Sequence, residues 1–122
     1  MQRVEIPRLD QELLRGGLFS LQTFFEAAEK SWLRFGEARI SVFLLDGITA
    51  DELRASGNAT ILKNYRQYRK VIVRDILIAG WQIQPTGAYP HFDLIKKELP
   101  SDSLYTELDL IFSEPKFFGG TE

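Results

Sequence analysis

The chain has 122 residues, of which 44% are hydrophobic and 26% charged, and its formal net charge is −2. These proportions are typical of globular proteins, so we expect a single domain over residues 1–122 and exclude a disordered chain. The lack of cysteine excludes disulfides, thiolate nucleophiles and cysteine-ligated metals, and the small net charge gives no general attraction to nucleic acid or anionic lipid.

The residues before Ser20 predict little regular structure. They lack the apolar core of a secretory signal, and no apolar run in the chain approaches the length of a membrane span. Both observations favour a cytoplasmic protein without a membrane partner. Residues 3–6 suit a short extended piece, and the Gly16-Gly17 doublet suits the end of a short helical turn that follows it.

An aromatic-rich helix is predicted over residues 20–35. Its apolar residues recur at helical spacing on one face, while the opposite face is polar. Ser20 is a suitable N-cap, and Gly36 suits the left-handed residue that closes a helix. We expect the apolar face to pack into the core, because a ligand groove is the much rarer use of such a face. That face consists of Leu21, Phe24, Phe25, Ala28 and Trp32.

Residues 38–45 predict the clearest strand of the chain. Apolar and polar residues alternate at first, and the end is apolar on both faces, as in a central strand. The Asp46-Gly47 pair ends this strand. Thr49 and Glu52 then have the spacing of a capping box, which predicts a short helix that extends to about Ala55.

The longest apolar pattern lies between Asn58 and Gly80, and it predicts one long central helix over about residues 59–79. Asn58 suits the N-cap of this helix and Gly80 its C-terminal end. The residues on its apolar face are spaced three or four apart. They are Ile61, Tyr65, Tyr68, Ile72, Ile76 and Ala79.

The second half of this stretch also allows a different structure. Residues 71–78 are rich in β-branched side chains, so a buried strand is the alternative to the helix. Only Arg74 and Asp75 are polar in this run. We therefore expect the run to be buried, either by this chain or by another copy of it.

The C-terminal third gives weaker patterns. Residues 82–84 suit an edge strand, because Pro85 cannot donate to a ladder. Residues 91–99 fit a strand and a helix equally well, whereas residues 101–112 favour a helix capped by Ser101 or Ser103, with a strand as the alternative. The fold class that follows is α+β, with the long helix and the aromatic-rich helix packed on a small sheet that includes strand 38–45.

The polar side of the predicted long helix is the first candidate binding site. Its four basic residues recur at helical spacing, and such a face can follow a phosphate backbone. They are Lys63, Arg66, Lys70 and Arg74. The net charge of −2 argues against a nucleic-acid-binding regulator, which we keep as the alternative function.

An acidic segment near the C-terminus offers the basic segment a partner. It contains four acidic residues and no basic one between residues 99 and 115. We expect the two segments to pair within the chain or across a dimer interface, where such pairs can fix orientation. The acidic residues are Asp102, Glu107, Asp109 and Glu114.

Catalytic chemistry has little support in the sequence. His91 is the only histidine, and the chain contains neither a nucleophile elbow nor a phosphate-binding glycine loop. The nearest set is Asp93 with Glu114 and Lys116, the residue types with which metal-dependent nucleases hold Mg²⁺ and orient water. We predict no catalytic residue, no metal site and no cofactor, and keep a metal-dependent nuclease as the third interpretation.

The C-terminus carries the second candidate binding site, Phe117 and Phe118. These side chains could dock into a partner or a sister subunit, but we favour the alternative that both fold back on the core. Abundant aromatic residues, separated charge and the missing catalytic set together predict a non-enzymatic protein-protein interaction or regulatory protein. We expect it to bind a protein partner or itself, as a homodimer or another homo-oligomer.

Overall fold

An antiparallel sheet of six strands organises residues 7–119, the part of the chain that this computed structural model describes. The strands lie in the order β4-β5-β2-β1-β3-β6, and every neighbouring pair is antiparallel. Their bounds are Glu12–Gly16 for β1, Ala38–Leu45 for β2, Gln67–Ile72 for β3, Gln82–Pro85 for β4, His91–Lys96 for β5 and Lys116–Phe117 for β6.

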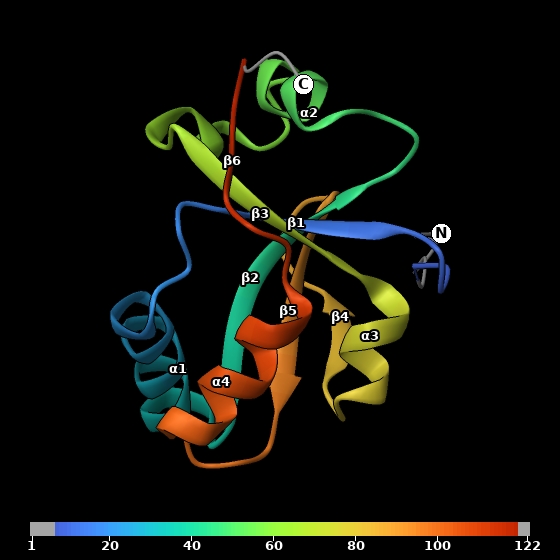
Figure 1. The fold of residues 1–122 in the computed structure, drawn as a ribbon. Coiled ribbons are helices and arrows are strands. Elements are labelled where there is room, and N and C mark those ends of the chain that lie inside the picture. Colours follow the sequence, from blue (N-terminus) through green and yellow to red (C-terminus); the bar gives the residue numbers. More distant parts are fainter. Residues whose placement is uncertain (1–6, 120–122) are drawn as a thin grey trace.

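Four α-helices and one 3-10 helix pack on this sheet. Figure 1 shows α1, α3 and α4 grouped in the lower part of the view and α2 at the opposite end. The helices are α1 (Leu21–Phe35), α2 (Ala50–Ala55), α3 (Val73–Ile78) and α4 (Asp102–Ile111), with the 3-10 helix η1 at Thr60–Asn64. The predicted α+β class is confirmed. Within residues 7–119, none of the helices has the length and apolar character needed to cross a membrane.

The sheet separates two hydrophobic cores, because successive strand residues point to opposite faces. Leu13 of β1 belongs to the larger core, together with buried residues of α1, α3 and α4 such as Phe24 and Ile76. Leu14, the next residue, belongs to a smaller core with Phe43 and Leu62, under α2 and η1. We call these the first and the second core.

The local signals between Ser20 and Ala55 were interpreted correctly. The Ser20 side chain accepts a hydrogen bond from the Thr23 N–H at 3.3 Å, and Gly36 closes α1 with a φ of 71°. Strand β2 has the predicted bounds, and the capping box of Thr49 with Glu52 is formed at the start of α2. Each of these elements depends on residues within a few positions, which the sequence displays directly.

The predicted long helix over residues 59–79 is wrong. The segment divides into η1, β3 and α3, and Tyr65 is extended, with φ −118° and ψ 144°. Strand β3 pairs along its length with β1, from Tyr68 opposite Gly16 to Ile72 opposite Glu12. Aromatic and β-branched residues favour a strand where a partner strand exists. That partner lies some fifty residues earlier in the chain, so helical periodicity could not reveal it.

Three of the six apolar residues in the run 71–78 are buried by this chain. Val71, Val73 and Ile76 point into the first core and are at most 2% exposed. Leu77 and Ile78 remain 43% and 76% exposed on α3. The strand alternative for this run is also wrong, because the chain turns into a helix at residue 73.

The remaining predictions divide between correct and wrong. Residues 12–16 form strand β1 in place of the predicted helical turn before Gly17, and the extended piece predicted at 3–6 lies outside the described residues. The edge strand is present as β4, and α4 is capped by Ser101, whose hydroxyl accepts from the Leu104 N–H at 3.1 Å. Residues 91–96 resolve the open choice in favour of a strand.

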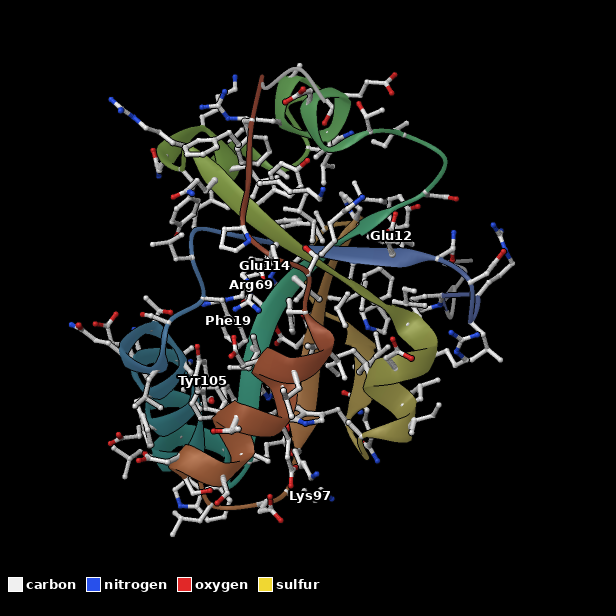
Figure 2. All side chains as sticks on the ribbon, viewed as in Figure 1. Glu12, Phe19, Arg69, Lys97, Tyr105 and Glu114 are labelled. Atoms are coloured by element: carbon white, nitrogen blue, oxygen red, sulfur yellow. The ribbon has the colours of Figure 1, made fainter. Side chains whose placement is uncertain are left out.

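A buried arginine, Arg69, ties β3 to α4. Its side chain is 8% exposed, and its Nη1 lies 2.7 Å from Oδ1 of Asp109. Its Nε donates to the Ser113 carbonyl at 2.7 Å, and its Nη2 donates to the Asp109 carbonyl at 3.1 Å. Figure 2 shows Arg69 and Phe19 close together, above Tyr105. The stretch 58–80 and the acidic segment therefore meet within the chain, but through Arg69, which is not one of the four predicted basic residues.

Tyr105 completes the Arg69 network. Its hydroxyl donates to the Phe19 carbonyl at 3.0 Å and lies 3.4 Å from Oδ1 of Asp109. Burial and then the Asp109 carboxylate raise the pKa of Tyr105 above its ordinary value, and the Arg69 guanidinium acts in the opposite direction. The Tyr105 hydroxyl therefore links α4 to the turn that leads into α1.

Candidate functional site

The four basic residues of the first predicted site do not share one face. Lys63 is exposed on η1, and Arg66 is exposed in the link before β3. Lys70 lies on β3 with its Nζ 3.4 Å from the Glu12 carboxylate, and Arg74 lies on α3 beside Asp75 at 3.7 Å. The basic helix face on which the nucleic-acid interpretation depended is therefore absent.

The two phenylalanines of the second predicted site differ from one another. Phe118 packs on the second core, with its ring centroid 4.7 Å from that of Tyr68 and the Arg54 guanidinium 5.0 Å above it. Phe117 on β6 is 63% exposed. The prediction that both side chains fold back on the core is therefore confirmed for Phe118 and wrong for Phe117.

The carboxylate set proposed for a nuclease is not assembled. Asp93 lies on β5, whereas Lys116 lies on β6 and Glu114 just before it. Four strand spacings separate β5 from β6 in the sheet order, which is roughly 19 Å at about 4.8 Å per spacing. Among the residues that the structure describes, no group of three or more His, Cys, Asp or Glu side chains could hold a metal ion.

The sheet opens between β1 and β2, and a pocket that contains a buried cation lies at this opening. The two strands pair only from Glu12 opposite Leu45 to Leu14 opposite Phe43, although β2 continues back to Ala38. In this register β1 offers Ser41 no backbone partner. Nη1 of Arg15 instead donates to the Ser41 carbonyl, at 2.8 Å. The arginine side chain thus occupies the place where the ladder stops.

The Arg15 pocket, as we call this site, has a volume of about 160 Å³. It is lined by residues from four separate parts of the chain. Most of the lining side chains lie on the sheet face that carries the second core, whereas the Arg15 side chain leaves β1 on the first-core face, beside Phe19. Its lining residues are Arg15, Gly16, Ser41, Phe43, Ile61, Leu62, Tyr65 and His91. Ile61 and Tyr65 are 51% and 37% exposed, so the rim of the pocket is apolar and aromatic.

Gly16 makes this arrangement possible. A Cβ at this position would lie 2.5 Å from Cδ2 of Tyr65, closer than side-chain carbons approach. The Tyr65 ring therefore rests against bare backbone at the end of β1. The glycine doublet that suggested the end of a helical turn has this packing role in the structure.

Among the described residues, Arg15 is the charged residue that has a buried side-chain nitrogen without a hydrogen-bond partner. A guanidinium carries five N–H donors, and here one hydrogen bond is formed, to Ser41. Its Nε is buried without a hydrogen-bond partner, and its Cζ lies 5.1 Å from the centre of the Phe19 ring. Burial lowers the pKa of Arg15, while Tyr65 and Asp93 act in the opposite direction. The pocket therefore holds a cation with spare donors.

Two lining residues, Ser41 and His91, lie near Asp93, and the three resemble the parts of a catalytic triad in a different order. Asp93 lies between the other two, with its Oδ1 3.3 Å from Ser41 Oγ and 4.0 Å from His91 Nε2. In a triad the histidine lies between the nucleophile and the acid. Nδ1 of His91 donates to the Thr86 carbonyl at 2.6 Å, which leaves Nε2 facing Asp93. This geometry does not activate Ser41 as a nucleophile.

Sequence reasoning missed the main residues of this pocket. Tyr65 was assigned to the core face of a helix that does not exist, and Arg15 lay in a segment for which no strand was predicted. The available signal was a lone cation directly after Leu13 and Leu14, two adjacent apolar residues that suit opposite faces of a strand. Comparison of this chain with protein-family models, with curated proteins and with solved structures gives no match.

Proposed function

We propose that the protein acts by binding another protein, without a chemical step of its own, and that the contact is centred on the Arg15 pocket. The observation that carries this proposal is the size of the pocket together with its exposed rim. Sites for drug-sized ligands have volumes of about 300–1,000 Å³. The Arg15 pocket has about 160 Å³, close to a cavity of ~150 Å³ that binds one benzene molecule. It therefore fits one inserted side chain.

The residue types around the pocket support a protein contact. Arginine and tyrosine are enriched among the residues that dominate binding energy at protein interfaces, and both line this pocket. Ile61 and Tyr65 expose apolar surface on its rim, where a partner can exclude water from the polar centre. A buried anchor with an apolar surround is the usual arrangement of an interface hot spot.

The proposed partner is a different protein. A symmetric dimer through this face would place one Arg15 pocket against another and bring two cations together without an anion from either rim. The homo-oligomer predicted from the sequence stays a prediction. The cytoplasmic location predicted from the sequence belongs to the same proposal, and the absence of cysteine fits a reducing compartment.

The outer edge of the sheet at β4 is a poor alternative docking site. In β4 the Thr86 N–H donates to the His91 carbonyl at 3.3 Å, so by alternation Ile83 and Pro85 direct their backbone groups away from β5. Proline has no N–H, which leaves that edge with few donors for an added strand. We therefore place the partner on the pocket and not on this edge.

Selection of displayed peptides tests the proposal. A random peptide library on phage is selected against the wild-type protein, and the dissociation constants of enriched peptides are measured for Ile61→Ser and Ile78→Ser. Both substitutions truncate an exposed isoleucine, but Ile78 lies on α3, away from the pocket. We expect Ile61→Ser to weaken binding at least about tenfold, because burying such a side chain contributes roughly 1.5–3 kcal/mol. Ile78→Ser should leave the dissociation constant unchanged.

Two results would contradict the proposal: no peptide is enriched, or the two variants bind the enriched peptides equally. Light scattering on the same wild-type sample tests whether a second copy of the chain occupies the pocket instead. A mass above the 14.0 kDa of one chain that falls on Ile61→Ser substitution would assign the pocket to self-association.

A further inference from the structure

Resting on the proposed function, we infer that the group which the partner inserts into the Arg15 pocket is a carboxylate side chain. The partner is then a protein that presents an exposed Glu or Asp in an otherwise apolar segment. Three features of the pocket lead to this chemistry: the spare donors of Arg15, the free hydroxyl of Tyr65 and the apolar rim.

The donors of Arg15 are the first feature. Its guanidinium is desolvated, uses one hydrogen bond to Ser41, and keeps an unpaired Nε. None of the carboxylates that the structure describes forms an ion pair with it. Carboxylates match the fork of guanidinium donors and form short, charge-assisted hydrogen bonds with it. An inserted carboxylate supplies acceptors for the Nη donors of Arg15 that the folded chain leaves unused, whereas the buried Nε is closed to it.

The walls of the pocket are the second feature. Tyr65 lines the pocket, and its hydroxyl makes no hydrogen bond with the described residues, so it can donate to the same ligand. Ile61 and Phe43 lie on the same lining and offer apolar contact to the methylene groups of the inserted side chain. Donors at the base and carbon at the rim match the shape of a glutamate.

Asp93 is the opposing charge, and its position decides where the ligand binds. Its side chain is 12% exposed, and its Oδ1 faces Ser41 Oγ and His91 Nε2. The inserted carboxylate therefore has to bind on the side of Arg15 and Tyr65. A neutral amide would avoid repulsion by Asp93, so the comparison of glutamate with glutamine is the critical one.

Nuclear magnetic resonance titration of the ¹⁵N-labelled protein provides the test. The probes are N-acetyl-glutamate N-methylamide, its glutamine counterpart, and acetate. We expect the glutamate probe to shift the amide signals of Gly16, Ser41 and Tyr65, and to bind at least about tenfold more tightly than the glutamine probe. Arg15→Met should abolish this preference. Arg39→Met, the matched control, should keep it, because Arg39 pairs with Glu37 outside the pocket.

Equal binding of the glutamate and glutamine probes would overturn the inference, and so would a preference that survives in Arg15→Met. The probe comparison uses the wild-type protein, so it decides the matter even if Arg15→Met fails to fold. If acetate binds as tightly as the glutamate probe, the pocket binds small free carboxylates, and the inference that the ligand is a side chain of a partner protein is overturned. Enriched peptides that lose affinity for Ile61→Ser are also tested with each Glu in the peptide replaced by Gln. If this replacement leaves binding to the wild-type protein unchanged, the inferred carboxylate ligand is overturned and the proposed function stands.

Discussion

Replacement of Arg69 by alanine is expected to lower the free energy of unfolding by about 3–4 kcal/mol. Breaking a buried ion pair costs roughly 3–5 kcal/mol, and the lower part of this range applies because the Asp109 side chain is 43% exposed. The variant also leaves the carbonyls of Ser113 and Asp109 without the donors that Arg69 supplies. Equilibrium unfolding in urea measures this change directly.

Arg66→Ala is the matched control for this experiment. It removes the same side chain three residues earlier, from an exposed position before β3. We expect its effect to lie within about 0.5 kcal/mol of zero, as for most surface substitutions. Equal effects of the two substitutions would show that Arg69 does not tie β3 to α4 as described.

Leu62→Ala is expected to lower the free energy of unfolding by about 2–5 kcal/mol, the range for removing a buried leucine side chain. Leu62 is fully buried in the second core, whereas its neighbour Ile61 is 51% exposed. Ile61→Ala should therefore change stability by less than about 0.5 kcal/mol. Urea unfolding of the two variants compares these neighbouring positions under one set of conditions.

This pair of variants also distinguishes the observed fold from a long helix over residues 59–79. In the helix, Ile61 would lie on the buried face, so Ile61→Ala would be the costly substitution. In the observed 3-10 helix the order is reversed, because η1 directs Leu62 under α2. A larger effect at Ile61 than at Leu62 would contradict the structure of this segment.

The elements that sequence reasoning placed correctly share a local cause. The N-cap at Ser20, the closing Gly36 and the capping box at Thr49 each act within three or four residues of the bond they form. Such signals survive whatever the rest of the chain does. The helix 101–112 was favoured for the same reason, through its cap at Ser101.

The elements that were misassigned depend on contacts between distant segments. Strands β1 and β3 define one another, and neither has a pattern that requires a strand without the other. The residues of β3 that matched a helical period, such as Tyr68 and Ile72, match a strand period equally well, since four positions fit both. The local sequence pattern therefore does not reveal that these two strands pair.

The Arg15 pocket could not be predicted for a related reason. Its lining comes from the end of β1, the middle of β2, η1 and the start of β5, which only the strand order brings together. The gap itself exists because β1 pairs with β3 as far as Gly16 but with β2 only as far as Leu14. Composition and periodicity do not reveal that one ladder of a strand ends two residues before the other.

The most direct test of the central claim is to map an enriched peptide on the wild-type protein by amide chemical shifts. The account predicts that the largest changes fall on Gly16, Ser41, Ile61 and Tyr65, around the Arg15 pocket, and that the α3 residues Leu77 and Ile78 do not respond. Largest changes on α3, or changes spread evenly over the molecule, would contradict the claim that this pocket is where the protein meets its partner.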